Sequence, residues 1–549
     1  MSPTRKATAK TSPAAAPAKP AVPVGSVAFV GAGPGDPGLL TVRAVELLGE
    51  AQVVVLAEHS REQYLGACAP DVAVLDGAFD AAGATLTPSA RGRVLTAAAK
   101  GGRRVVRLMD GDPGLNGALA EEAAACLKAG LEFQVVPGVA PISAVPAFAG
   151  VPLTNRTVRE VRVVDAQDPK VDWAALASKD ATLVVTHTTS TALVAGAAAK
   201  LIEAGLDPAT PALTTWAGTT TEQRTVAAAL AGLGKALPHE PLEPGGLTVI
   251  GDVVALRDSL SWFETRPLFG WRVLVPRTKE QSAGLVSRLR SFGAVPEEVP
   301  TISVEPPRAP QQMERAIKGL VTGRYEWIAF TSRNAVKAVR EKFEEYGLDA
   351  RAFSGIKVAA VGEQTAADLA GWGIKADLVP SGEQSAQGLL NDWPPYDDVF
   401  DPINRVFLPR ADIATETLVA GLIDLGWEVD DVTAYRTVRA APPPAPVREA
   451  IKSGGFDAVV FTSSSTVRNL VGIAGKPHAS TVIACIGPAT AAAAEEHGLR
   501  VDVLAETPSA VALADALAAF GTARRTAAAE AGDPVLRPSE KRSSARRRR

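Results

Sequence analysis

The chain has 549 residues, of which 46% are hydrophobic and 21% charged, with a formal net charge of −3. This length suits roughly three or four compact domains, so a single small binding module is excluded. No apolar run approaches the roughly 20 residues of a membrane-spanning helix. The three cysteines, Cys68, Cys126 and Cys485, lie too far apart for a disulfide framework or a metal cluster. A cytoplasmic protein without membrane contact is therefore expected.

The two ends of the chain differ from its middle in charge. Residues 1–24 are rich in Ala, Pro and Lys and carry four basic and no acidic residues, whereas residues 521–549 carry nine basic and three acidic ones. Neither end has apolar anchors, which predicts a disordered leader without an export signal and a basic disordered tail. The tail ends in KRSSARRRR, which could contact nucleic acid, but a solvated tail is the preferred interpretation and no nucleic-acid partner is expected.

From residue 25, short β-branched runs alternate with Ala- and Leu-rich amphipathic segments. This alternation predicts α/β layers with largely parallel strands. A break near 151–160 divides a first unit, 25–258, into lobes of about 25–155 and 156–258. The predicted strands of the first lobe are SVAFVG (26–31), QVVVLA (52–57), RRVVRL (103–108) and FQVVPG (133–138).

A connector at 259–270 leads into a second unit, 271–520, in which the chain repeats itself. Three paired motifs predict two related α/β lobes. Their order predicts interleaving, with one lobe from about 271–303 and 437–520, the other from about 304–436, and two crossing strands between them. The pairs are WRVLVPR (271–277) with NRVFLPR (404–410), WIAFTSRNAV (327–336) with AVVFTSSSTV (458–467), and VAAVGEQTAADL (358–369) with VIACIGPATAAA (482–493).

The loop VGAGPGDPGLL (30–40) follows the first predicted strand. It differs from the dinucleotide fingerprint because its third glycine comes two residues after the second instead of three. A glycine turn after a strand lets backbone N–H groups approach a ligand closely, which favours a cofactor site, and a plain strand-to-helix turn is the alternative. The five histidines lie far apart without ligand spacing, so no metal site is predicted.

Five ordered motifs give residues 25–258 a family resemblance: GAGPGDPGLLTVRA, RRVVRLMDGDP, FQVVPGVAPISAVPAFAGVPLTNR, GTTTEQR and TVIGDVV. This part of the chain resembles a uroporphyrinogen-III C-methyltransferase of the tetrapyrrole methylase class. The resemblance implies a two-lobed unit that holds S-adenosylmethionine between its lobes, methylates a tetrapyrrole carbon and forms a homodimer. It implies cofactor contacts at Pro34, Gly35, Asp36, Gly111, Asp112, Leu115, Ala140, His187 and Gly218.

The match departs from the family pattern where that family does its chemistry. Leu56 and Ala57 replace a Tyr-Asp pair whose aspartate is expected to act as a base, and neither can accept a proton. Further departures are Asp110 for glycine, Pro141 in an expected Thr-Ala pair, and His187 for methionine. Methyl transfer depends mostly on positioning, so loss of one base need not abolish it. The alternative is a non-catalytic scaffold or a regulatory domain that binds S-adenosylmethionine or a tetrapyrrole.

Residues 270–520 resemble a uroporphyrinogen-III synthase, on the repeated Pro-Arg strand ends and on FTSRNAV, VAAVGEQTA, LPRAD, AYRTV and FTSSSTV. The resemblance implies a two-lobed, flavodoxin-like enzyme without a cofactor. It implies cyclisation of hydroxymethylbilane with inversion of the last pyrrole ring and loss of water. The alternative interpretation is a two-lobed binding protein of the periplasmic type. Such a protein would need an export signal, and residues 1–24 are not expected to contain one.

The tetrapyrrole substrate carries many carboxylates, and helix N-termini with hydroxyl caps make anion sites. Such sites are predicted where FTS motifs and glycines end apolar strands, with ordinary N-capping as the alternative for each. The candidate substrate-binding residues are Thr331, Ser332, Arg333, Asn334 and Gly362 in one lobe, and Thr462, Ser463, Ser464 and Gly487 in the other.

Tyr435, in TAYRTV (433–438), matches a tyrosine that the synthase family places near its cleft. Its phenol would help the departing hydroxyl leave as water, as a general acid. A core tyrosine with its hydroxyl bound to the backbone is the alternative. Arg277 and Arg410 end matching strands and would clamp carboxylates or face solvent. The whole chain thus reads as a fusion of consecutive activities, and tethering them raises the local concentration of the shared intermediate.

Overall fold

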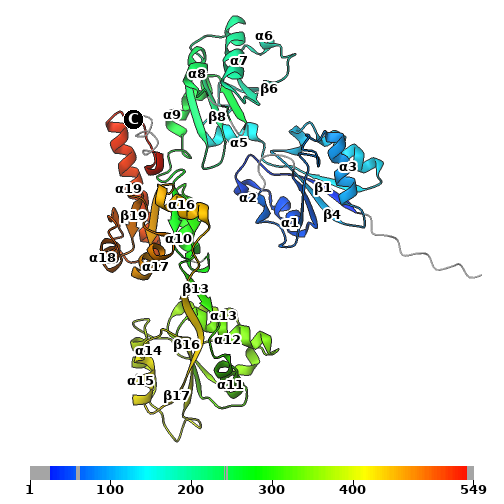
Figure 1. Cartoon of the computed structure of the whole chain (residues 1–549). Helices are drawn as coiled ribbons and strands as arrows, with labels where there is room; N and C mark the ends of the chain where they lie inside the picture. Colours follow the sequence, from blue (N-terminus) through cyan, green and yellow to red (C-terminus); the bar gives the residue numbers. More distant parts are fainter. Residues whose placement is uncertain (1–24, 57–61, 240, 243–244, 278, 541–549) are drawn as a thin grey trace, which may run out of the picture. The chain divides into compact units, whose positions relative to one another are not determined.

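The computed structural model describes residues 25–56, 62–239, 241–242, 245–277 and 279–540. The chain divides into two compact units, Met1–Gly270 and Trp271–Arg549, and Figure 1 shows the elements of each. The predicted α/β fold class is confirmed, since both units are built from sheets with parallel strands and connecting helices. Within the described ranges, no helix is long and apolar enough to cross a membrane.

The first sheet of unit 1, called sheet 1, is fully parallel and five-stranded. Its strands in spatial order are β3 (Ala73–Asp76), β2 (Val53–Leu56), β4 (Arg104–Met109), β1 (Ser26–Gly31) and β5 (Glu132–Val136). Side chains alternate between two cores, because successive residues of a strand point to opposite faces. Ala28 and Val30 pack with α1 (Val42–Glu50) and α2 (Glu62–Leu65). Val27 and Phe29 pack with α3 (Pro88–Ala98) and α4 (Leu119–Lys128).

The second sheet of unit 1, sheet 2, is mixed. Its strands in spatial order are β6 (Glu160–Asp165), β7 (Ala181–Thr186), β10 (Gly246–Ile250), β8 (Pro211–Trp216) and β9 (Arg224–Ala229). One face packs on α7 (Thr191–Glu203) and α8 (Leu230–Ala236). On the other face, Val145 of α5 (Pro141–Phe148) packs with Val184, Leu213 and Leu247. The short helices α6 (Trp173–Leu176) and α9 (Arg257–Leu260) complete this part.

In unit 2, sheet 3 combines segments that are far apart in the sequence. Its parallel strands in order are β12 (Val295–Glu298), β11 (Arg272–Val275), β18 (Ala458–Phe461), β19 (Val482–Cys485) and β20 (Val503–Leu504). The helices α16 (Ala445–Ser453), α17 (Ser464–Ala474) and α18 (Pro488–Glu496) share one core. The remaining helices, α10 (Lys279–Ser291) and α19 (Ala510–Glu530), contact each other.

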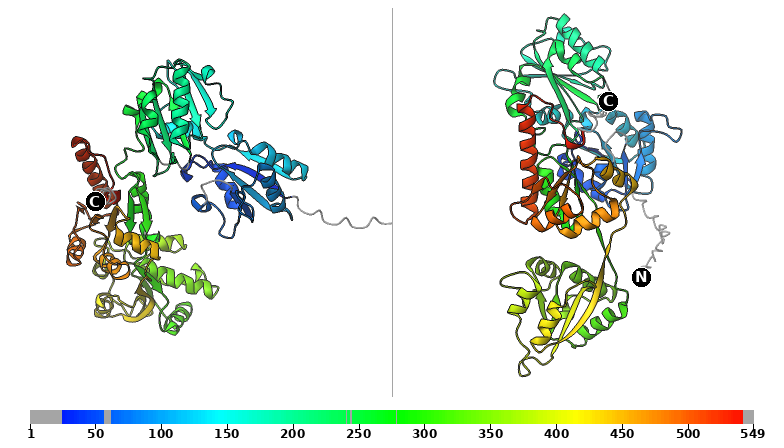
Figure 2. Two further views of the ribbon diagram at one scale, coloured as in Figure 1. Left: turned by 45° about the horizontal axis from the view of Figure 1, so that its top comes forward. Right: turned by 60° about the vertical axis from the view of Figure 1, so that its left-hand side comes forward.

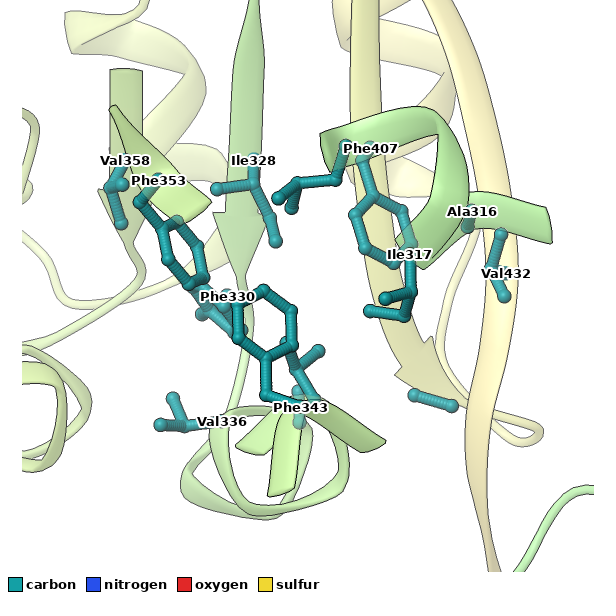
Figure 3. Close-up of a cluster of buried hydrophobic side chains, with 14 of the residues drawn as sticks. Ala316, Ile317, Ile328, Phe330, Val336, Phe343, Phe353, Val358, Phe407 and Val432 are labelled. Atoms are coloured by element: carbon teal, nitrogen blue, oxygen red, sulfur yellow. The ribbon is translucent and has the colours of Figure 1, made fainter. Parts of the chain in front are cut away.

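Sheet 4 lies between these segments in the sequence. Its strands in order are β13 (Ile302–Glu305), β17 (Glu428–Arg439), β16 (Arg405–Ala411), β14 (Trp327–Phe330) and β15 (Lys357–Ala360). One face packs on α11 (Pro310–Val321), α12 (Arg333–Glu345) and α13 (Glu363–Gly371), and the other on α14 (Ala386–Asp392) and α15 (Thr417–Asp424). Figure 3 shows the first core, which contains Phe330 of β14, Phe343 of α12 and Phe353.

The chain passes twice between sheets 3 and 4. The antiparallel pair β13 and β17 forms this crossing, with Ile302 opposite Arg439 and Glu305 opposite Arg436, and both strands are visible side by side in Figure 2. An ion pair of 2.6 Å between Arg436 and Glu305 joins the two strands.

Candidate active sites

Three loops of unit 1 meet at the carboxyl edge of sheet 1. Because its strands are parallel, the loops after β1, β4 and β5 leave the sheet at the same edge. Gly33 and Gly111 exchange backbone hydrogen bonds of 3.2 and 2.8 Å. A Cβ added to Gly31 would lie 2.5 Å from the Gly138 Cα, which no side chain tolerates. The backbones of the three loops therefore touch, which requires glycine at these positions.

Two predicted cofactor residues on the β4 loop, Asp112 and Leu115, lie at this junction. The Asp112 carboxylate accepts hydrogen bonds from Gly114 N–H at 2.7 Å and from Gly138 N–H at 2.9 Å. Asp112 thus fixes the β5 loop to the β4 loop. Leu115 lies in the short 3-10 turn that Asp112 caps and is 64% exposed, so its apolar side chain is left uncovered.

A fourth loop, after β8, joins the first three. The backbone N–H of Asp36 donates to the Thr219 hydroxyl at 3.2 Å. A Cβ on Gly35 would lie 2.9 Å from Thr220 Cγ2. A Cβ on Gly218 would lie 2.5 Å from a Val145 methyl group on α5. The predicted residues Gly35, Asp36 and Gly218 are thus brought together, with Pro34 in the same loop as Gly35.

Ala140 and His187 are the two remaining predicted cofactor residues. Ala140 is the residue before α5, and Pro141 begins that helix. A Cβ on Gly111 would lie 2.6 Å from Pro141 Cδ, so Ala140 and Pro141 border the same junction. His187 contacts Thr186 and pairs with Asp165 of β6 at 3.1 Å. Ala57, where the family pattern expects a base, lies outside the described residues.

Two residues of this junction, Thr219 and Gln223, are absent from the sequence-based site. Thr219 has a φ of 65°, which is unusual for a β-branched residue. Its backbone N–H donates to the Gln223 side-chain oxygen at 2.8 Å, and Gln223 is fully buried. Both residues belong to the motif GTTTEQR, so the motif could have pointed to them. The positive φ of Thr219, however, cannot be predicted from its residue type.

In unit 2, the predicted catalytic tyrosine and one predicted cap are in contact. The Tyr435 hydroxyl on β17 lies 2.9 Å from the Ser332 hydroxyl. Ser332 follows β14 and caps α12, where its oxygen accepts from Ala335 N–H at 3.1 Å. Thr331 and Asn334 flank this cap in the sequence. The Tyr435 ring is buried in the core of sheet 4, and its hydroxyl meets a side-chain hydroxyl at a helix N-terminus.

Arg333, the first residue of α12, makes an ion pair with Asp368 of α13. Two hydrogen bonds of 2.6 and 3.0 Å join the guanidinium to the carboxylate. This hydrogen bonding raises the pKa of Arg333. About half of its side chain is exposed, so the guanidinium keeps a face toward solvent while it holds the neighbouring helix.

Gly362 follows β15 and is the N-cap residue of α13. Strand β15 is the neighbour of β14, so the N-termini of α12 and α13 lie at one edge of sheet 4. The Gln384 side-chain oxygen accepts from Glu363 N–H at 3.2 Å and would be 2.8 Å from a Cβ on Gly362. A neutral side-chain acceptor therefore already lies on this helix N-terminus.

The second set of predicted substrate residues follows the neighbouring strands β18 and β19 of sheet 3. Ser463 caps α17 and accepts from Thr466 N–H at 3.3 Å. The Ser464 hydroxyl donates to the Ala489 carbonyl of α18 at 2.8 Å, which joins the two helix N-termini, and Gly487 is the cap residue of α18. Among the described residues, the buried Thr462 hydroxyl has no hydrogen-bond partner.

Arg410 and Arg277 differ in their surroundings. Arg410 is 6% exposed and pairs with Asp431 and Glu416. The hydrogen bond to Asp431 raises the pKa of Arg410 most, and the one to Glu416 raises it further. It is therefore neither surface-facing nor open to a ligand. Burial lowers the pKa of Arg277.

Both units thus have the α/β architecture of enzymes whose ligands commonly bind at the carboxyl ends of parallel strands. The family model for uroporphyrinogen-III synthase HemD matches residues 283–515, and the model for tetrapyrrole (corrin/porphyrin) methylases matches residues 26–234. The chain belongs to the HemD family, as a uroporphyrinogen-III synthase domain preceded by a tetrapyrrole methylase domain. Both predicted resemblances are confirmed.

Two proteins of similar sequence agree with this assignment. The porphyrin biosynthesis protein HemD of Ruminiclostridium josui is 31% identical over 90% of this chain and 98% of its own length. The uroporphyrinogen-III C-methyltransferase of Bacillus subtilis (strain 168) is 31% identical over 63% of this chain and 71% of its own length. Among solved structures, the uroporphyrin-III C-methyl transferase of Thermus thermophilus complexed with S-adenyl homocysteine covers 42% of this chain and 93% of its own, with 31% identity and a TM-score of 0.35.

Proposed function

We propose that unit 2 cyclises hydroxymethylbilane to uroporphyrinogen III with inversion of the last pyrrole ring, and that Tyr435 is its general acid. The observation that carries this proposal is the 2.9 Å contact between the Tyr435 and Ser332 hydroxyls at the N-terminus of α12. A phenol there has both a proton to give and a hydroxyl partner beside it.

The proposed step begins at the hydroxymethyl end of the substrate. The Tyr435 O–H donates its proton to the substrate hydroxyl, the C–O bond breaks, and its electron pair leaves on oxygen as water. The pyrrole nitrogen supplies electrons to the carbon that loses oxygen. The Ser332 hydroxyl then donates to the phenolate oxygen of Tyr435, and the positive end of the α12 dipole favours that negative charge. This step uses no cofactor.

The substrate carboxylates would be held at the N-termini of α12, α13, α17 and α18, where the Gln384 oxygen already accepts from one N–H group of α13. Ser332 and Ser463 are the N-cap residues of helices that follow β14 and β18. Gly362 and Gly487 are the N-cap residues of the helices that follow the neighbouring strands, β15 and β19. Backbone N–H groups at such ends bind anions without lysine. The unpaired Thr462 hydroxyl supports this role, because a buried hydroxyl without a partner is costly unless a ligand meets it. Thr331, Arg333, Asn334 and Ser464 lie beside these caps.

We further propose that unit 1 binds S-adenosylmethionine at the junction of its four loops. When bound, the cofactor supplies an electrophilic methyl group on a positively charged sulfur. Close backbone packing at the glycines brings the four loops together at one edge of sheet 1, and the side chains gathered there fit such a ligand. Asp36 and Asp112 provide carboxylates for a cation or a hydroxyl, and the exposed Leu115 provides apolar surface.

The acceptor would be the uroporphyrinogen III that unit 2 produces, which is methylated on carbon. In this chain the position of the expected base carries Ala57, so catalysis would depend on holding the acceptor carbon in line with the methyl group. The second candidate, a unit that binds the cofactor without methyl transfer, is favoured by the same departure and by Pro141, which has no backbone N–H to offer.

One experiment separates these possibilities. The full chain is supplied with hydroxymethylbilane, with and without S-adenosylmethionine, and the products are identified by chromatography and mass spectrometry. The type III product in both reactions, with added methyl groups only when cofactor is present, is the expected result. Unmethylated type III product in both would overturn methyl transfer and leave the synthase. Type I product alone would overturn the synthase reaction.

A homodimer formed through unit 1 and a location in the cytoplasm are further proposals. Size-exclusion chromatography with light scattering tests the first, and cell fractionation tests the second. The proposed ligands are all small molecules, so nucleic acid is not expected to change either reaction.

A further inference from the structure

Residues 261–270, the greater part of the connector at 259–270, are folded onto unit 1. Trp262 Nε1 donates to the Ala147 carbonyl of α5 at 3.0 Å. Phe263 is 4% exposed and meets the Phe148 ring edge-to-face at 4.7 Å. These contacts fix the connector against α5, the helix that follows the β5 loop.

Glu264 of the connector is almost buried and has several partners. Its carboxylate is 14% exposed and forms an ion pair with Arg257. One oxygen also accepts from the Thr225 hydroxyl at 2.8 Å and from the Gln223 side-chain amide nitrogen at 3.2 Å. A carboxylate can only accept hydrogen bonds, so it selects the NH₂ end of the Gln223 amide.

With its nitrogen held by Glu264, Gln223 directs its oxygen at the Thr219 backbone. The 2.8 Å bond from Thr219 N–H to that oxygen holds a threonine with a φ of 65°. A β-branched residue keeps such a conformation only where its surroundings impose it. The Thr219 hydroxyl in turn accepts from Asp36 N–H at 3.2 Å. An unbroken chain of hydrogen bonds therefore runs from the connector to the glycine loop.

We propose that Glu264 is a positioning residue of the cofactor site in unit 1. It orients Gln223, which holds Thr219 and, through it, the loop of Gly35 and Asp36. This inference rests on the proposed binding of S-adenosylmethionine by unit 1. The segment that leads to the synthase is, on this account, also part of the machinery that shapes the methylase cofactor site.

The test compares three full-length variants with the wild type: Glu264→Ala, Glu264→Gln and Glu203→Ala. Glu203 is an exposed glutamate at the end of α7 and serves as the control. Affinity for S-adenosylhomocysteine is measured by calorimetry, and the exchange rate of the Thr219 amide by hydrogen–deuterium exchange without ligand. Glu264→Ala should weaken binding at least about tenfold and speed Thr219 exchange. Glu264→Gln keeps an acceptor oxygen and should weaken binding less, and Glu203→Ala should change neither.

A second variant separates positioning from folding. Gln223→Met keeps the shape of the buried side chain but removes both hydrogen bonds. The double variant combines Glu264→Ala with Gln223→Met. If Glu264 acts through Gln223, its affinity for S-adenosylhomocysteine should be no lower than that of the single variant with the lower affinity, since the effects of residues in one network do not add. Additive losses would overturn the proposal, as would an unchanged Thr219 exchange rate in Glu264→Ala. If the wild type binds no S-adenosylhomocysteine, the proposed function of unit 1 fails, and the exchange measurement alone decides whether Glu264 holds Thr219.

Discussion

The Tyr435 hydroxyl lies 2.9 Å from the Ser332 hydroxyl, although the two residues are 103 positions apart in the chain. The same Ser332 oxygen accepts from Ala335 N–H at 3.1 Å. The serine thus links the end of α12 to a phenol on β17. The roles of Tyr435 and Ser332 can therefore be tested separately. The bond from Ala335 N–H stabilises the helix N-terminus, and the contact with Tyr435 serves the proposed general acid.

Replacement of Tyr435 by phenylalanine should lower kcat of the synthase reaction by about 10²–10⁴-fold, the range typical of a lost general acid. The ring still fills the core of sheet 4, so the fold should persist. Steady-state rates and product analysis measure the effect. Tyr325→Phe is the matched control, because Tyr325 is also buried and its hydroxyl donates to Asp430 at 2.7 Å. Tyr325 precedes β14, whereas Ser332 follows it, so this control should keep the wild-type rate. Equal rates for Tyr435→Phe and wild type would exclude the proposed acid.

Replacement of Ser332 by alanine removes both contacts of this oxygen. The lost cap should lower the free energy of unfolding by about 1 kcal/mol, and kcat should fall as well because the phenolate loses its donor. Ser385→Ala is the control, since Ser385 caps α14 with a 3.1 Å bond from Gly388 N–H. It should lose similar stability and keep its activity. Urea unfolding and the synthase rate are the two measurements, and a fall in kcat for both variants would argue against a specific role.

Replacement of Gly111 by alanine should abolish binding of S-adenosylhomocysteine to unit 1. Gly111 has a φ of 69°, and an added Cβ would lie 2.6 Å from Pro141 Cδ, so the β4 and β5 loops must separate. Gly117→Ala is the control because a Cβ there meets no atom within 4 Å. Calorimetry on the full chain measures both variants. Unchanged affinity in Gly111→Ala would mean that the cofactor site lies elsewhere.

The parts of these sites that follow from local sequence are those in which a strand runs directly into a helix. Ser332 and Ser463 cap helices where the repeated FTS motifs predict them, because an apolar run followed by a hydroxyl residue and an amphipathic run defines such a junction. The helix N-termini of unit 2 were therefore predictable, and so was the contact between loops that leave one edge of a parallel sheet.

The remainder depends on contacts between distant residues. Arg410 ends a strand as its repeat partner does, yet its side chain pairs with Asp431, 21 residues later, and nothing in the motif specifies that partner. Thr219 has a backbone conformation that its residue type disfavours, so local propensity points away from it. Glu264 reaches Gln223 across 41 residues. Such pairings are determined by the packed fold and leave no periodic signal.

Glu122 of α4 forms ion pairs with two arginines, Arg91 of α3 and Arg107 of β4, between sheet 1 and its helices. Its side chain is fully buried and accepts from Arg91 at 2.5 Å and from Arg107, itself fully buried, at 3.0 Å. Glu122→Gln should destabilise this lobe by about 3–5 kcal/mol, because two guanidinium groups then lose their counter-charge. Hydrogen exchange of the β4 amides in the full chain measures the local effect. The neighbouring exposed Glu121→Gln should change exchange little, and equal protection in both variants would contradict the prediction.

The three thiols should differ in reactivity. Burial raises the pKa of Cys126 and of Cys485 to about 11, with smaller contributions from Glu122 and Glu495 respectively. At pH 8 their thiolate fractions are then about a hundredfold lower than at an ordinary pKa of 9. Cys68 is partly exposed, and burial raises its pKa as well. Ellman's reagent at pH 8 should therefore label Cys68 in the folded chain and all three thiols in denaturant, and Cys68→Ser should remove the native labelling.

The same pKa values set the sign of the pH dependence. Below pH 9 the thiols of Cys126 and Cys485 are protonated in both the folded and the unfolded chain, so they contribute no slope. Between about pH 9 and 11 the unfolded chain loses these protons first, while the folded chain keeps them, so the free energy of unfolding falls as the pH rises. Urea midpoints of the wild type and of Cys485→Ala, measured from pH 8 to 11, check this. The variant should show a shallower decline, and parallel curves would show that burial of this thiol does not shift its titration.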